Sequence, residues 1–182
     1  MLEALKYLLI TPFKPTASFR SFKEERHIFT TSQWMILGIV LVFAIDMGAH
    51  YDPKFHMTTG DWVAFYAGRL VGLVLTFLLP TYIVAVVLKR NGFEEVTFKK
   101  AFPYMLMIGL PIYASTWDVN WYFRPDGYVG YIKWGAKFWA WLLLTKVIRH
   151  LAPVSESKSW AIAFGVIVIE FLWHSGFWGI SL

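Results

Sequence analysis

Five apolar runs, each about as long as a bilayer is thick, constrain this chain more than any other feature of its sequence. A helix crosses the hydrocarbon core of a membrane in about 20 residues. A chain of 182 residues that is 57% hydrophobic and 19% aromatic also carries more apolar surface than a water-soluble domain of that size can bury. The sequence therefore predicts an all-α protein, a polytopic membrane helix bundle with five transmembrane helices at residues 33–50, 62–88, 101–116, 131–147 and 160–178.

The distribution of basic residues predicts the orientation of this bundle. Cytoplasmic segments of membrane proteins carry an excess of Lys and Arg. Of the 17 Lys and Arg residues, twelve lie in the N-terminal tail and in the two loops on its side of the membrane, and only Lys54 and Arg124 lie in the opposite loops. We therefore expect the N-terminus inside and the C-terminus outside.

Net charge and cysteine content narrow the classes of function. The net charge of +5 is explained by topology, so nucleic acid is not an expected partner, whereas the lipid bilayer and other integral membrane subunits are. The chain has no cysteine, which excludes disulfides, iron–sulfur clusters and thiolate metal sites.

Two regions are expected, a cytoplasmic arm at residues 1–32 and the five-helix transmembrane domain at residues 33–182. The arm is too polar to span, but it begins with a short helix that carries an apolar face. That face is made of Leu2, Leu5, Leu8 and Leu9. The helix either lies in the membrane interface or packs under the bundle.

Local signals mark helix ends and one helix break. Thr31 or Ser32 is expected as the N-cap of the first span, and Ser157 or Ser159 as the N-cap of the fifth. The third span is short and is interrupted by Gly109 and Pro111. Because proline lacks an N–H, the carbonyl of Met107 loses its helical partner there, and we expect a break or kink.

Two acid–histidine pairs stand out in the apolar sequence. Asp46 and His50 are four residues apart near the outer end of the first span, and Glu170 and His174 repeat this spacing in the fifth. Residues four apart share one face of a helix, so each pair can present two ligands to a common point. If the two spans run in the same direction, the pairs lie at matching depth, and four such ligands suit a transition metal.

Basic residues are expected in the same outer layer. Arg69 lies in the second span, Lys133 and Lys137 lie in the fourth, and His56 in the adjoining loop is a further possible ligand. The cluster therefore has several readings: interhelical ion pairs with Asp46 or Glu170, a metal site, or a haem b held between His50 and His174. A fourth reading is a proton or ion pathway, for which intramembrane charges and a broken helix are typical.

Three stretches resemble the Yip1-type family of five-span membrane proteins. They are "LKRNGFEEVTFKKAFPYMLMIGLPIY" from Leu88, "TPFKPTASFRSF" before the first span, and "VIRHLAPVSESKSWAIAFGVIVI" before the last. The eukaryotic members' D-L-Y-G-P signature is missing. The resemblance implies a non-catalytic bundle that works through partners. Locally, Asp46 and His50 also look like the D-x-x-x-H metal ligands in one subunit of the copper membrane monooxygenases.

The functional expectation is therefore a non-catalytic accessory or scaffold subunit of a larger membrane complex. The sequence has no phosphate-binding glycine loop, H-E-x-x-H motif or serine nucleophile elbow. The alternatives are a metal- or haem-binding redox subunit and a proton or ion transport component.

Overall fold

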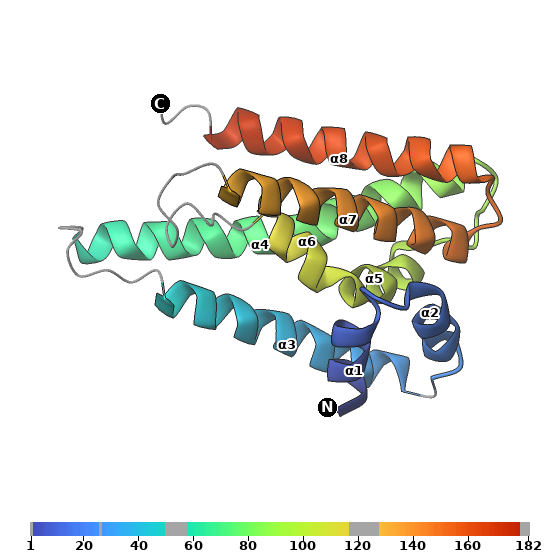
Figure 1. Ribbon diagram of the computed structural model, residues 1–182, viewed down its shortest axis with the longest axis horizontal. Helices are drawn as coiled ribbons and strands as arrows, with labels where there is room; N and C mark the ends of the chain where they lie inside the picture. The colour runs from blue at the N-terminus through green and yellow to red at the C-terminus, as the bar shows by residue number, and fades with distance from the viewer. Residues whose placement is uncertain (1, 26, 50–57, 117–127, 179–182) are drawn as a thin grey trace.

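The computed structural model describes residues 2–25, 27–49, 58–116 and 128–178, and all regular structure in these ranges is helical. The prediction of an all-α fold is confirmed. The helices are, in chain order, α1 (Leu2–Ile10), α2 (Pro15–Lys23), α3 (Ile28–Ala49), α4 (Thr59–Arg90), α5 (Phe98–Met107), α6 (Gly109–Thr116), α7 (Tyr128–Leu151) and α8 (Glu156–Trp178) (Figure 1).

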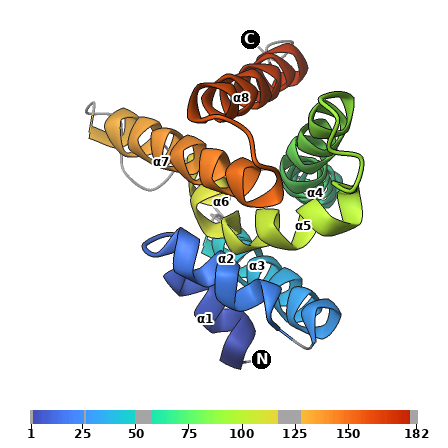
Figure 2. The same ribbon diagram turned by 90° about the vertical axis from the view of Figure 1, so that its right-hand side faces the viewer.

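The long helices α3, α4, α7 and α8 run lengthwise through an elongated bundle, and α5 and α6 lie between them (Figure 1). Seen along the bundle, α3 lies on the side of α1 and α2, while α8 lies at the opposite edge (Figure 2). The contacts agree, because α8 packs on α7 and α4, whereas α3 packs on α1 and α5.

Helices α3, α4, α7 and α8 overlap four of the five segments predicted as spans and extend beyond most of their ends, and the third segment is divided between α5 and α6. Within the described residues, two helices are long and apolar enough to cross a membrane, at Ile28–Ile45 in α3 and Thr59–Arg90 in α4.

The break between α5 and α6 confirms the expectation for the third span. Helix α5 ends at Met107 and α6 begins at Gly109, with Ile108 between them. Pro111 has no N–H to donate to the Met107 carbonyl, and the regular pattern resumes where the Ile112 N–H donates to the Ile108 carbonyl at 3.2 Å.

Gly109 also allows three helices to meet at this break. A Cβ atom added at Gly109 would lie 2.8 Å from Cδ1 of Ile39 in α3 and 2.9 Å from Cε1 of Phe77 in α4. No side chain fits there without displacing these neighbours. The most deeply buried side chains surround the break and the end of the bundle that holds the arm, and include Met35, Leu88, Met105, Met107, Ile108 and Ile148.

Two predicted helix starts are wrong by a few residues. Helix α3 begins at Ile28, five residues before the predicted span, so Ser32 lies inside the helix and its hydroxyl donates to the Ile28 carbonyl at 2.7 Å. Helix α8 begins at Glu156, and its cap is Ser155, whose hydroxyl accepts from the Lys158 N–H at 3.4 Å. Helix α8 is extended by a polar first turn, whereas α3 starts with Ile28 and Phe29, which already belong to its apolar segment.

The N-terminal arm lies against the side of the bundle. In α1 the side chains of Ala4, Tyr7 and Leu8 are buried, and Leu8 Cδ1 lies 2.9 Å from the position of a Cβ at Gly38, in the middle of α3. The turn after α1 reaches α7, where Trp139 Nε1 donates to the Pro12 carbonyl at 3.2 Å. The arm therefore joins α3 to α7.

Candidate functional site

The predicted polar cluster is distributed over four helices that reach the same end of the bundle, at the left of Figure 1. Its members are Asp46 near the end of α3, Arg69 in α4, Lys133 and Lys137 in α7, and Glu170 and His174 in α8. His50 and His56 lie outside the described residues. Of the six members on the helices, only Lys137 has a described side chain, and it is half-buried.

The helix neighbours distinguish the two acids. Helix α8, which carries Glu170, packs on α4 and α7, the helices that carry Arg69, Lys133 and Lys137. Helix α3, which carries Asp46, packs on α1 and α5 instead. The helices that carry the predicted cations are therefore neighbours of α8, the helix of Glu170.

No group of three or more His, Asp or Glu side chains that could hold a metal ion occurs among the residues the structure describes. The predicted ligands Asp46, His50, Glu170 and His174 lie outside the side chains covered by this finding. The metal and haem readings therefore stay predictions.

An aromatic joint connects the arm to the other end of the bundle. It consists of Phe19 and Phe22 from α2, Tyr104 from α5 and His150 from α7. The Tyr104 ring lies 5.5 Å from Phe22 and 4.8 Å from His150, and Phe19 lies 5.4 Å from His150, between ring centroids. Edge-to-face pairs such as Tyr104 with Phe22, at 76°, contribute roughly 0.5–1.5 kcal/mol beyond burial of area.

His150 is the group of this joint whose usual pKa lies closest to neutral pH. Burial against the rings, together with the positive charge of Lys23, lowers its pKa below the usual 6.5. The neutral imidazole is therefore the form that packs in the joint.

An exposed apolar stripe follows the length of α4. It consists of Val63, Leu70, Val71, Val74, Leu78 and Tyr82, and we call it the α4 stripe. From Val63 to Tyr82 the helix rises 19 residues, or about 28 Å at about 1.5 Å per residue. Its side chains are between 38% and 63% exposed. The stripe is thus nearly as long as the hydrocarbon core of a bilayer is thick, about 30 Å.

Among the described residues, the N-terminal half of α4 is less buried than the C-terminal half. Among its described side chains none is buried before Leu73. It contains Gly68 and Gly72, four residues apart. Among the residues that the structure describes, none outside the helix's own nearby backbone has an atom within 4 Å of where a Cβ would stand at Gly72. In a membrane, such G-x-x-x-G spacing lets a second helix approach closely. This spacing is visible in the sequence, but the polar-cluster interpretation does not use it.

Comparisons with known proteins give no relatives: no protein-family model, curated protein or solved structure matches this chain. The resemblance to the Yip1-type family therefore stays a prediction.

Proposed function

We propose that this chain is an integral membrane protein with five spans and its N-terminus inside, which acts as a non-catalytic accessory subunit. It holds a transmembrane helix of another membrane protein against the outer half of α4. The observation that carries this proposal is the α4 stripe together with Gly72, where no described atom beyond the helix's own nearby backbone lies within 4 Å of the position of a Cβ.

The share of buried residues supports a membrane environment. In the core helix of a water-soluble protein most residues are buried, but only 28% of the apolar segment is buried in α3 and 39% in α4. Exposing this much apolar surface to water would cost about 25 cal/mol per Å². In lipid the same surface is stable, and a bundle of this shape needs no further covering.

The features of the outer half of α4 favour contact with a partner helix over contact with lipid alone. Association of helices in lipid depends on close packing at small residues. Gly68 and Gly72 border the α4 stripe, and no other described part of the chain fills the space over Gly72. A helix that packs there would bury Val71 as well.

The absence of native cysteines allows a direct test by crosslinking. We would place a single cysteine at Val71, beside Gly72, and a matched cysteine at Ile169 of α8. Both positions are exposed, and each lies nine residues from the outer end of its predicted span, so they are equally deep. In native membranes we expect Val71→Cys to form an adduct with another membrane protein, and Ile169→Cys to form none.

A second substitution makes the result specific. Adding Gly72→Leu to Val71→Cys fills the open space and should abolish the adduct. The docking proposal is wrong if Val71→Cys and Ile169→Cys behave alike, or if the only adduct is a second copy of this chain. The predicted orientation is tested separately, because a reporter fused after Leu182 should be active on the non-cytoplasmic side.

A further inference from the structure

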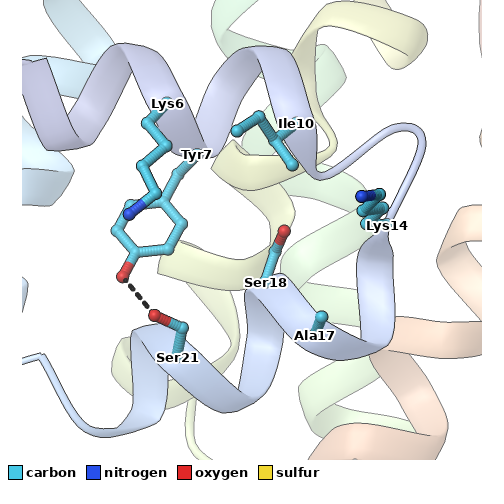
Figure 3. A pocket seen from close by; sticks show the side chains of 7 residues that line it. All are labelled: Lys6, Tyr7, Ile10, Lys14, Ala17, Ser18 and Ser21. Atoms are coloured by element: carbon cyan, nitrogen blue, oxygen red, sulfur yellow. Dashed lines mark hydrogen bonds between the residues drawn. The ribbon is translucent and has the colours of Figure 1, made fainter.

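A small pocket opens between α1 and α2 in the N-terminal arm (Figure 3). Its volume is about 170 Å³, and it is lined by residues of these two helices and of the turn between them. Two of the lining side chains, Tyr7 and Ser18, are buried at 3% and 7% exposure, and the other lining residues are more accessible. The pocket is therefore a feature of the folded arm that is open to a ligand from outside.

The polar groups of the pocket are suited to an anion. Lys6 and Lys14 are among the residues that line the pocket, and no acidic residue of the described part of the chain lines it. Most of the lining surface is apolar, so the ammonium groups act from the rim. The hydroxyls of Tyr7 and Ser21 lie 3.3 Å apart, and either can donate to an incoming oxygen. Lys6 also forms an exposed ion pair with Glu3 at 3.2 Å, so this carboxylate competes with an anionic ligand.

The start of α2 adds uncapped backbone donors. Lys14 occupies the N-cap position without a side-chain cap, and Pro15 follows it. Ala17, in the first turn, lines the pocket. N–H groups in the first turn of a helix have no acceptor within the helix and favour an anion.

Apolar side chains surround this anion-binding site. Leu9 and Ile10 at the end of α1 are 57% and 40% exposed, and Phe13 in the turn is 74% exposed. Leu2 and Leu5 extend the same exposed apolar surface along α1. A ligand that combines a negative group with hydrocarbon would satisfy both kinds of surface.

The arm lies at a depth where such a ligand occurs, if the spans are placed as proposed. Gly38, which contacts Leu8, is five residues from the inner end of the first span, or about 8 Å by helical rise. Trp139, which binds the Pro12 carbonyl, is eight residues from the inner end of the fourth span, or about 12 Å. These two contacts lie on the side of the arm that faces the bundle, whereas Lys6 and Lys14 are exposed and their long side chains can extend toward the headgroups.

We propose that the pocket between α1 and α2 binds the phosphate group of an anionic lipid of the inner leaflet. This inference rests on the proposed function in requiring a membrane-embedded bundle. Lys6, Lys14 and the Tyr7–Ser21 hydroxyls hold the phosphate, and the exposed apolar side chains of α1 and the turn contact the acyl chains.

The size of the pocket favours a lipid over a bare ion. A cavity of roughly 150 Å³ holds a benzene molecule, and a single water needs about a tenth of that volume. At about 170 Å³ the pocket accommodates a phosphate together with the first carbon atoms attached to it.

The test uses the full chain purified in mild detergent. Native mass spectrometry would measure the binding of phosphatidylglycerol, of zwitterionic phosphatidylcholine, and of inorganic phosphate. We expect phosphatidylglycerol to bind in preference to phosphatidylcholine, and Lys6→Gln/Lys14→Gln to weaken its binding about ten- to thirty-fold. Glu3→Gln should strengthen it, because the competing carboxylate is removed.

The matched control is Lys99→Gln/Lys158→Gln, which removes the same charge from exposed positions on α5 and α8 outside the pocket. This variant should bind phosphatidylglycerol as the unmodified chain does. Equal losses in both double variants, or equal binding of the two lipids by the unmodified chain, would overturn the inference. Displacement of the lipid by an equal concentration of inorganic phosphate would also overturn it, because the pocket would then recognise free phosphate.

Alkaline carbonate extraction separates this inference from the proposed function. If the chain stays in the membrane fraction but the pocket variants bind lipid normally, only the lipid site is wrong. If carbonate releases the chain from membranes, the membrane assignment itself is wrong, and the lipid site fails with it.

Discussion

Gly109 offers the sharpest test of how this bundle is packed. Substitution to alanine adds one methyl group at the point where α3, α4 and the α5–α6 break meet. That methyl would lie 2.8 Å from Ile39 Cδ1, 2.9 Å from Phe77 Cε1 and 3.2 Å from Phe77 Cζ. Ordinary contacts between carbon atoms are about 3.5–4.0 Å, so the neighbours must move by more than half an ångström.

The expected cost follows from which neighbour can move. The Ile39 methyl is the end of a flexible side chain, but the Phe77 ring is 5% exposed and held among other buried groups. Overpacking of this kind costs about 1–3 kcal/mol, and the better helix propensity of alanine returns up to about 1 kcal/mol. We therefore expect Gly109→Ala to destabilise the protein by about 1–2 kcal/mol, or roughly 2–8 °C in Tm.

Gly165 provides the matched control for this prediction. It also lies inside a helix, but beyond that helix's own backbone no atom of the described residues is within 4 Å of the position of its Cβ. In thermal unfolding followed by circular dichroism in detergent, Gly165→Ala should be neutral or slightly stabilising. Adding Phe77→Leu to Gly109→Ala should recover part of the loss, because the two side chains compete for one space. Equal Tm values for the two alanine variants would refute this account of the close packing.

Three further predictions concern the arm and the polar cluster. Because His150 has a lowered pKa in the fold, stability should be complete above about pH 6.5 and fall as the pH drops below that value, and His150→Phe should flatten this dependence in Tm measurements. Trp139→Phe removes the hydrogen bond to the Pro12 carbonyl and should cost about 1 kcal/mol, seen as faster proteolysis of the arm; an unchanged rate would contradict the role of that bond. Protein purified in mild detergent without chelator should be colourless and free of stoichiometric metal, and a metal or haem band that disappears in the His50→Ala/His174→Ala variant would instead establish the redox alternative.

Much of the secondary structure could be predicted from the sequence because its signals are local. Apolar runs gave the long helices, and the missing N–H of Pro111 gave the break after Met107. Helix starts were less predictable. Helix α8 begins with a polar turn that hydropathy does not include, and α3 begins with Ile28 and Phe29, which the polar residues Thr30 to Gln33 separate from the longer apolar run. Ser155 is the clearest case, since it caps α8 one residue before the helix and several residues before the apolar run.

For the candidate sites too, the spacing of residues could be predicted but their contacts could not. The acid–histidine spacing of Asp46 with His50 and of Glu170 with His174 could be read from the sequence, as could Gly68-x-x-x-Gly72. Whether such groups meet depends on which helices are neighbours, and local spacing carries no such information. The packing of α8 on α4 and α7, and of α3 on α1 and α5, could therefore be learned only from the fold.

The class of this protein, a chain of apolar helices with a basic N-terminal side, follows from the sequence. Hydropathy, charge and the missing N–H of proline are properties of individual residues and act on the local structure. The tertiary structure alone decided that the arm lies beside α3 and α7 and forms a pocket with Lys6 and Lys14. It alone decided that Gly109 is enclosed while Gly72 is open. Both results depend on contacts between residues far apart in the chain, where shape complementarity between side chains selects among arrangements that the local pattern allows equally.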